Sequence, residues 1–390
     1  MSYKALDFFN ADELLSEEEL IIRDTARKFV DKEVLPIIPH HWEAGTFPTE
    51  LIPKLAELGF LGPFIPQEYG GPGCSYTMYG LICRELERGD SGIRSFASVQ
   101  GSLVMYPIWK FGSEEQKLHY LPKLASGEWV GCFGLTEPDA GSDPRAMVTH
   151  VKKDGGAWIM NGAKMWITNG TIADIAVVWA KDESDRVRGF IVHKDDPGFS
   201  APEIKHKISL RASVTSELVF NDVRLPADRE LPYTEDLKSP LMCLTSARYG
   251  IAWGAVGAMQ AVFDEALNYT GSRVQFGKPV AAFQITQSKL TNMATELTNA
   301  QLMASRLGQL ADSHKMKFYH VSMAKRQNVA AALEASRVAR AMLGANGITL
   351  EYQTIRHMCN LESVHTYEGT YDIHTLIIGE QLTGISAFGN

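Results

Sequence analysis

The chain has 390 residues, of which 45% are hydrophobic and 22% charged, and its formal net charge is −8. This composition is typical of a globular protein with a large core, and without a long Lys or Arg block we expect no nucleic-acid partner. No apolar run approaches the ~20 residues of a membrane span, so we expect none. The N-terminus shows no signal-peptide pattern, which predicts a cytoplasmic protein if bacterial, or a mitochondrial-matrix one if a mature eukaryotic chain.

The cysteines and histidines give no sign of a disulfide framework or a metal site. The five cysteines are odd in number and contain no Cys-x-x-Cys pair. This usage favours a reducing compartment, with the cysteines as small core residues. The eleven histidines show no spacing typical of metal ligands, so we expect no metal.

Sequence patterns typical of helices recur through the first part of the chain, and we expect a helical domain over residues 1–128. Ser16 and Glu19 have the spacing of a capping box, and apolar residues follow at helical intervals. Ser113 and Gln116 repeat the same capping signal farther along.

The pattern then changes to alternating residues rich in Val, Ile, Trp and Thr, which predicts a β domain over residues 129–235. Asp154-Gly155-Gly156 is a turn signal between two of its expected strands. The expected strands are 148–153, 158–160, 175–180, 189–193 and 217–220.

Long amphipathic segments return in residues 236–390. They predict helices over 240–271, 284–313, 317–343 and 371–387. Four such helices with short links are typical of an antiparallel bundle. The expected fold is therefore an α+β multi-domain protein with an N-terminal helical domain, a central β-barrel or sandwich, and a C-terminal four-helix bundle.

Residues 133–144 read Phe-Gly-Leu-Thr-Glu-Pro-Asp-Ala-Gly-Ser-Asp-Pro and follow the apolar start of the β domain. Gly141 lets a backbone approach a flat ligand, and Thr136 and Ser142 offer hydroxyl donors at its rim. An ordinary loop after a strand is the alternative interpretation.

Three more segments carry similar signals. Trp166 beside Thr168 offers an aromatic wall and a hydroxyl, although a strand Trp in the core is an equal alternative. Arg273 before a glycine turn is a candidate diphosphate clamp, although a helix-end salt bridge is the commoner use. Residues 343–347, Leu-Gly-Ala-Asn-Gly, form a glycine-rich turn that alone would indicate only a helix C-cap.

With the segment Thr-Tyr-Glu-Gly-Thr at 366–370, these motifs and the α-β-α order resemble the acyl-CoA dehydrogenase family, flavoproteins that desaturate acyl-CoA thioesters. The resemblance covers essentially the whole chain and implies FAD as cofactor, electron-transferring flavoprotein as electron acceptor, and a homotetramer. One departure is Ala345, where the family usually has a second glycine. The FAD-binding residues that it implies are Phe133, Gly134, Leu135, Thr136, Gly141, Ser142, Trp166, Ile167, Thr168, Arg273, Phe276, Gln284, Ala341, Met342, Leu343, Gly344, Ala345, Thr370, Asp372 and Phe388. Of these, Arg273, Gln284 and the turn 342–345 would serve the FAD of a neighbouring subunit.

The resemblance also implies the catalytic base. A hydrogen beside a thioester carbonyl is weakly acidic, and its abstraction needs a carboxylate in a dry pocket. Any single Glu is more often a solvated surface residue, but Glu368 lies at the family position of the base, between Tyr367 and Gly369. We expect burial to raise its pKa. Its backbone N–H, with a ribityl hydroxyl of FAD, would polarise the thioester oxygen.

Segments 84–95 and 246–254 and the C-terminal tail are similar to the family members that act on glutaryl-CoA. Arg94, with Ser95 and Ser98 beside it, is the expected partner of the distal carboxylate of that substrate. For a plain acyl chain, the same Arg would be an unpaired buried charge. The alternative is a structural Arg94 paired with Glu87 or Asp90, and a mixed role with Glu87 is also open.

Tyr367 and Glu87 are similar to those of members that decarboxylate the product to crotonyl-CoA. The expected function is therefore FAD-dependent oxidative decarboxylation of glutaryl-CoA to crotonyl-CoA and CO2. The open alternatives are a non-decarboxylating glutaryl-CoA dehydrogenase, a short-chain acyl-CoA oxidase and a non-catalytic acyl-CoA or flavin-binding protein.

The CoA portion has weaker marks in the sequence. The resemblance implies a channel in which Arg248 is the charged contact, although an intrahelical ion pair is nearly as plausible for it. The channel residues that it implies are Ser142, Leu241, Met242, Cys243, Leu244, Thr245, Ser246, Ala247 and Arg248.

Overall fold

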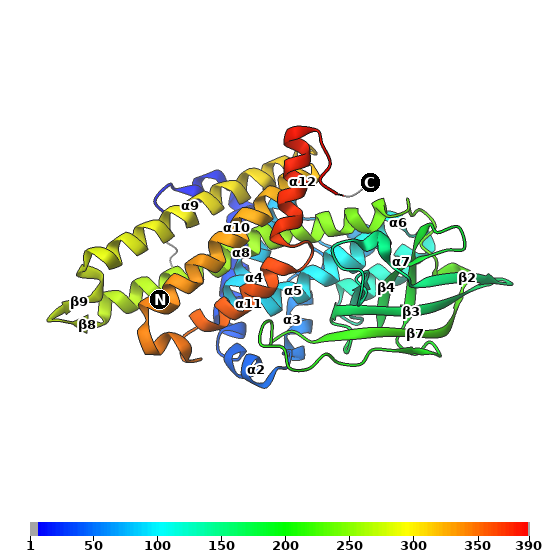
Figure 1. The fold of residues 1–390 in the computed structure, drawn as a ribbon, viewed down its shortest axis with the longest axis horizontal. Coiled ribbons are helices and arrows are strands. Elements are labelled where there is room, and N and C mark those ends of the chain that lie inside the picture. The colour runs from blue at the N-terminus through cyan, green and yellow to red at the C-terminus, as the bar shows by residue number, and fades with distance from the viewer. Residues whose placement is uncertain (1–6, 389–390) are drawn as a thin grey trace.

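A computed structural model describes residues 7–388 of the chain. It confirms the expected fold class, since helices form the beginning and the end of the chain and a sheet lies between them. In Figure 1 the sheet lies on the right, and the long helices of the C-terminal part extend to the left, away from it. Within residues 7–388 no helix is long and apolar enough to cross a membrane.

The N-terminal part is a set of short helices. Both capping boxes predicted from the sequence are present, at Ser16 with Glu19 and at Ser113 with Gln116. Two π-helical stretches, Val30–Val34 and Val99–Met105, extend helices of this part. The α-helices are α1 (Glu17–Phe29), α2 (Ile38–Ala44), α3 (Ile52–Glu57), α4 (Tyr76–Gly89), α5 (Ser91–Ser98), α6 (Tyr106–Phe111) and α7 (Glu114–Ala125).

The sheet has seven strands, and every predicted strand lies in it. Its order is β1-β4-β2-β3-β7-β6, and β5 pairs with β4. Two of the strands, β3 and β7, are longer than predicted, because both continue past register shifts in their pairing. The strands are β1 (Gly131–Gly134), β2 (His150–Asp154), β3 (Ala157–Thr168), β4 (Ile175–Lys181), β5 (Val187–His193), β6 (Phe199–Ser200) and β7 (Thr215–Pro226).

The C-terminal part contains five helices among the described residues, where four were predicted. They are α8 (Lys238–Ser272), α9 (Gln284–Asp312), α10 (Phe318–Met342), α11 (Thr354–Thr366) and α12 (Tyr371–Thr383), and a small hairpin of β8 (Val274–Gln275) and β9 (Lys278–Pro279) follows α8. Sequence periodicity missed α11, because the side that it buries carries polar residues, among them Arg356, His357 and Asn360. The last helix, α12, ends earlier than predicted, since Gly384 takes a left-handed conformation with φ of 71°.

Glycines of α8 let it approach α4 closely. A Cβ added at Gly257 would lie 1.8 Å from the carbonyl oxygen of Arg84, and one at Gly254 would lie 1.9 Å from Oε2 of Glu87. A larger residue at Gly257 would require the helices to move apart, and one at Gly254 would displace the side chain of Glu87. These glycines therefore set the distance between the two helices.

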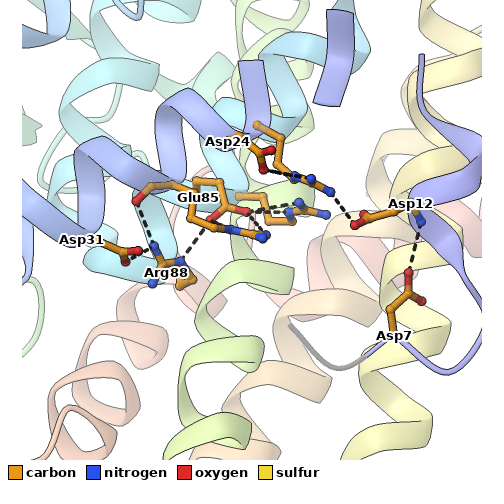
Figure 2. Close-up of polar contacts among 9 residues, drawn as sticks. Asp7, Asp12, Asp24, Asp31, Glu85 and Arg88 are labelled. Carbon is orange, nitrogen blue, oxygen red and sulfur yellow. Dashed lines mark hydrogen bonds and ion pairs between the residues drawn. The ribbon is translucent and has the colours of Figure 1, made fainter. Parts of the chain in front are cut away.

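A buried ionic cluster attaches α1 to α4 (Figure 2). The carboxylate of Glu85 accepts from Arg27 of α1 at 2.9 Å, and from Arg84 and Arg88 of its own helix at 3.1 and 3.0 Å. Arg88 also pairs with Asp31 at 2.6 Å. Burial of Glu85 opposes its ionisation, but the three guanidinium charges outweigh burial and lower the pKa of Glu85 to about 2.

Glu85→Gln should lower the free energy of unfolding by about 3–5 kcal/mol at pH 7, because the three arginines lose the carboxylate between them. Urea unfolding followed by circular dichroism measures this, with Glu18→Gln on the exposed side of α1 as the matched control. The folded pKa is lowered, so the stabilisation is complete above the unfolded pKa and is lost as the pH falls from about 4.5 towards 2. The difference between wild type and variant should shrink in that window. A Glu85→Gln protein as stable as Glu18→Gln at pH 7 would contradict the role of the cluster.

Candidate active site

The loop between α11 and α12, residues 367–370, holds its glutamate in an unfavourable backbone conformation. Glu368 has φ of 51° and Gly369 has φ of 94°, both in the left-handed region. The loop ends at Thr370, whose hydroxyl caps α12 by accepting from the backbone N–H of Ile373. A residue with a Cβ adopts a positive φ at a cost, so the surrounding contacts must hold Glu368 in place.

Two buried side chains bind the backbone of this loop. Lys325 of α10 donates from Nζ to the carbonyl oxygens of Tyr367 and Gly369, each at 2.6 Å. Arg248 of α8 donates from Nε to the carbonyl oxygen of Glu368, also at 2.6 Å. Each carbonyl from residue 367 to residue 369 therefore accepts a hydrogen bond from a basic side chain, which fixes the backbone on both sides of Glu368.

The carboxylate of Glu368 lies in a dry environment. Its Oε2 atom is buried and has no hydrogen-bond partner. Burial raises the pKa of Glu368, and the nearby charges of Arg94, Lys325 and Arg248 only partly oppose this rise. His374 contributes no charge, because burial lowers its pKa to about 2. A carboxylate with a raised pKa and a free oxygen is suited to accept a proton from carbon.

Arg94 of α5 connects this loop to α4. Its Nε donates to Oε2 of Glu87 at 2.6 Å, and its Nη2 donates to the hydroxyl of Tyr367. Asp90, the other partner considered from the sequence, pairs instead with Arg356 at 2.5 Å. Arg94 is fully buried. The expectation that a plain acyl chain would leave Arg94 unpaired is therefore wrong, because Glu87 already supplies the counter-charge.

Ser95 and Ser98 lie on α5 with Arg94 and are buried. The helix segment predicted to line the CoA channel divides into two faces. Leu241 is exposed, and Met242, Leu244 and Thr245 are partly exposed, so these four remain available to a ligand. Ser246 is buried, and its hydroxyl has no hydrogen-bond partner.

Three residues of that segment are placed differently from the prediction. Cys243 and Ala247 have no accessible surface, because they lie on the face of α8 packed into the core, and they do not line a channel. Arg248 was predicted to contact CoA. Its Nε instead donates to the backbone of the glutamate loop, and burial lowers its pKa to about 10.

A buried ion pair fixes the segment that follows β1. Lys164 of β3 donates from Nζ to the carbonyl oxygen of Leu135 at 3.1 Å and to Oε1 of Glu137 at 2.8 Å. The carboxylate of Glu137 also accepts from the backbone N–H groups of Val148 and Thr149. Burial lowers the pKa of Lys164 to about 8, although Glu137 opposes this shift. Lys164 thus binds both neighbours of Thr136, Leu135 and Glu137, and so fixes the backbone conformation there.

Strand β3 also presents an exposed tryptophan. Trp166 has φ of 64° and lies where the pairing of β3 with β7 shifts between Lys164 and Ile167. Such an irregularity redirects a side chain, and 61% of Trp166 is exposed. A Cβ at Gly141 would meet no atom within 4 Å, so space is open there as well.

Some predicted flavin contacts lie in the core. Ile167 is 3% exposed and packs within the sheet core, and a Cβ at Gly134 would meet Lys164 at 3.1 Å and Leu218 at 3.2 Å. Their side-chain positions therefore face inward and do not form a flavin surface. Phe133 and Leu135 are also buried, whereas Thr136, Ser142, Thr168, Thr370, Asp372 and Phe388 keep exposed area.

A second group of predicted residues meets in a cleft of about 270 Å³. Arg273 lines it together with the turn 342–345. Phe276 is 93% exposed, and Gln284 and Ala341 are also exposed. Arg273 directly follows α8, and Arg248 lies 25 residues earlier in the same helix, so ~37 Å of helix separates this cleft from the glutamate loop.

The family comparisons agree along the chain. Residues 16–128, 132–223 and 237–383 match the models of the N-terminal, middle and C-terminal domains of acyl-CoA dehydrogenase. The short-chain specific acyl-CoA dehydrogenase of Homo sapiens mitochondria is 35% identical, over 94% of this chain and 90% of that protein. The chain belongs to the acyl-CoA dehydrogenase family.

Solved structures of this family are similar over the whole chain. A glutaryl-CoA dehydrogenase from Mycobacterium smegmatis, in complex with FADH2, is 50% identical with a TM-score of 0.97, over 98% of this chain and 99% of that one. A glutaryl-CoA dehydrogenase solved in complex with glutaryl-CoA is 32% identical with a TM-score of 0.92, over 97% of both chains. This acyl-CoA dehydrogenase is thus an FAD-dependent enzyme that oxidises an acyl-CoA.

The residues present fit the cofactor. An exposed tryptophan, open space at Gly141 and a hydroxyl at Thr136 suit one side of a flat ring system. No group of three or more metal-ligating side chains was found in the described part of the chain.

Sequence reasoning missed Lys325 and the Lys164–Glu137 pair. Lys325 had a signal, since it lies on the same helical face as Val321, Ala324 and Val329, all of which are buried. A lysine on an apolar face indicates a buried amine that needs acceptors. The sequence does not identify those acceptors, because they are backbone carbonyls more than 40 residues away.

Gly369→Ala should abolish most flavin reduction by acyl-CoA. An added Cβ would lie 2.9 Å from Nε2 of His374 and 3.1 Å from Nη2 of Arg248, at a φ that alanine disfavours. We expect at least a 100-fold loss in the rate of anaerobic flavin bleaching, with FAD still bound. Gly156→Ala, where a Cβ meets nothing, should keep the wild-type rate. Equal rates for the two variants would show that the loop tolerates movement.

Proposed function

We propose that this acyl-CoA dehydrogenase catalyses the oxidative decarboxylation of glutaryl-CoA to crotonyl-CoA and CO2. The observation that carries the proposal is Arg94. Glu87 balances its charge, but a guanidinium buried beside Glu368 and bonded to Tyr367 offers donors that a purely apolar acyl pocket does not use. A substrate with a carboxylate at its far end gives that charge a use.

In this proposal Glu368 is the base. It takes the proton from the carbon beside the thioester carbonyl, and burial, which raises its pKa, makes it a stronger base for that task. The backbone N–H of Glu368 donates to the thioester oxygen and stabilises the charge that develops there. Lys325 and Arg248 hold the loop while this occurs.

FAD, when bound, accepts the hydride from the next carbon of the chain. Trp166, Thr136, Ser142 and Thr168 would hold it. The cleft formed by Arg273 and residues 342–345 lies ~37 Å along α8 from the base, which is too far for it to serve the reacting end of the same cofactor. We therefore assign this cleft to the FAD of a second subunit. The family resemblance supports a homotetramer, with electron-transferring flavoprotein as the electron acceptor.

Loss of CO2 completes the reaction. Removal of one proton and one hydride gives glutaconyl-CoA, in which the carbon that bears the carboxylate adjoins a double bond conjugated with the thioester. The bond from this carbon to the carboxylate breaks, CO2 leaves, and the electron pair spreads into a dienolate that the N–H of Glu368 stabilises. The protonated carboxyl of Glu368 then returns its proton to the terminal carbon. The products are crotonyl-CoA, CO2 and the reduced cofactor.

Glu87 would assist the release of CO2. Because it already shares Arg94 at 2.6 Å, the substrate carboxylate would meet a cation that is partly neutralised. Weaker stabilisation of the charged starting group lowers the barrier to forming neutral CO2.

One observation favours a second function. Arg94 has a counter-ion and no accessible surface, so a short apolar acyl chain would leave no charge unpaired. The human short-chain relative at 35% identity agrees with this alternative, which is dehydrogenation of an unbranched short acyl-CoA such as butyryl-CoA. The non-decarboxylating alternative shares the same site and differs in its end product, and the oxidase alternative differs in letting oxygen reach the reduced flavin.

The deciding experiment is mass analysis of the CoA product after purified holoenzyme meets glutaryl-CoA and an artificial electron acceptor. We expect crotonyl-CoA. Glutaconyl-CoA as the end product would support dehydrogenation of glutaryl-CoA and contradict its decarboxylation. Unchanged glutaryl-CoA, together with rapid turnover of butyryl-CoA, would establish the second function. Glu368→Gln, which keeps the size of the side chain, should bind FAD but form no product, because it has no base.

Arg94→Met should reduce kcat/KM for glutaryl-CoA about 100-fold more than kcat/KM for butyryl-CoA, because only the first substrate loses a partner for a charge. Single removal of Arg94 leaves Glu87 buried without its cation, so the double variant Arg94→Met with Glu87→Gln keeps the site neutral. Arg337→Met, at an exposed ion pair with Glu362, is the control. Equal losses on both substrates in the double variant would mean that Arg94 is structural.

A further inference from the structure

We infer that Lys325 is a positioning residue for the reaction, which holds the carboxylate of Glu368 at the reacting carbon by binding the two carbonyl groups on either side of it. The inference rests on Glu368 being the base, as proposed above. It adds a residue on α10 to a site otherwise built from α4, α5, α8 and the loop 367–370.

The contacts of Lys325 explain the curled shape of the loop. In an extended chain the carbonyl oxygens of residues two apart lie about 6.6 Å from each other, on the same side. One nitrogen at 2.6 Å from both oxygens requires them to be closer than that. The chain between Tyr367 and Gly369 must therefore turn, and Glu368 at φ of 51° makes this turn.

The other two basic side chains near the loop, Arg248 and Arg94, do not bind the carbonyls of Tyr367 and Gly369. Arg248 bonds only to the middle carbonyl, that of Glu368, and Arg94 bonds to the side chain of Tyr367. Neither replaces the bonds to the flanking carbonyls. Without Lys325, the carbonyls of Tyr367 and Gly369 lose the hydrogen bonds that hold the loop in its left-handed conformation.

The two hydrogen bonds from Lys325 to the carbonyls of Tyr367 and Gly369, called the clamp below, persist through neutral pH. Burial lowers the pKa of Lys325 to about 7, with Arg248 and Arg94 adding to this shift and Glu368 opposing it. His374, facing the same loop from α12, is uncharged near neutral pH because its pKa is about 2. A neutral amine keeps two N–H donors, which equals the number of flanking carbonyls, so loss of its proton leaves both bonds in place.

Lys325→Met keeps the length of the side chain and removes the donors. We expect the rate of flavin reduction at saturating substrate to fall about 100-fold, as a misplaced reacting group causes. The dissociation constant of the acyl-CoA and the FAD content should change less than threefold. The α-deuterium isotope effect on flavin reduction should rise, because proton abstraction becomes slower. Lys325→Arg, which restores donors, should recover part of the rate.

Lys207→Met is the matched control, because Lys207 also binds two carbonyls, those of Leu210 and Ser213, in a different loop. It should lose stability but keep the rate of flavin reduction and the isotope effect. If Lys325→Met behaved like Lys207→Met, or if its rate loss only followed lost FAD, Lys325 would be structural and the inference wrong.

Each variant is assayed with both butyryl-CoA and glutaryl-CoA, so that a wrong substrate assignment can be distinguished from a wrong role for Lys325. A positioning role predicts the same fold loss on each acyl-CoA that wild type oxidises, even if that is butyryl-CoA alone. A loss confined to glutaryl-CoA would overturn the clamp and assign Lys325 to the distal carboxylate. Hydrogen exchange provides a readout without turnover: the amides of Glu368 and Gly369 should exchange at least tenfold faster in Lys325→Met and at the wild-type rate in Lys207→Met.

Discussion

The close approach of α8 to α4 is the constraint on which the rest of the site depends. Gly254 and Gly257 permit it, because a Cβ at either position would overlap α4. At that distance Gly254 of α8 lies against Glu87, and Glu87 reaches Arg94. One turn and a half earlier in α8, Arg248 reaches the glutamate loop. A wider separation would move the Arg94–Glu87 pair away from the helix whose Arg248 binds the glutamate loop.

Glu85, which is buried, and Glu368, which is partly buried, have opposite pKa shifts, and their contacts explain the difference. Glu85 receives hydrogen bonds from three guanidinium groups on its carboxylate, so its charged form is strongly favoured. Glu368 also has cations near it, but Arg248 and Lys325 donate to backbone carbonyls and leave the carboxylate oxygen Oε2 without a partner. The fold thus uses nearly the same residue types for stability in one place and for a raised pKa in the other.

The sequence predicted what depends on local pattern. Both capping boxes, the strands and the long helices were found, because propensity and periodicity act over a few residues. It missed α11, whose buried face is polar because Arg356 and Asn360 bind Asp90 across the core. The family resemblance predicted Arg248 as a contact of CoA, whereas the acceptor of its Nε is a carbonyl 120 residues away. Such pairings depend on tertiary contacts, which no local pattern encodes.

The position of Tyr367 links substrate choice to catalysis under the proposed function. Its hydroxyl accepts a hydrogen bond from Arg94, its carbonyl accepts one from Lys325, and the next residue is the proposed base. Arg94 has no accessible surface in this state, so under this proposal a distal carboxylate would reach it by displacing the tyrosine hydroxyl, one of its two partners. A substrate that does so moves the side chain next to Glu368, while the clamp on the backbone keeps the base in place. In this proposal the acyl chain would be recognised by an exchange at Tyr367, and Lys325 would keep that exchange from disturbing the carboxylate that reacts.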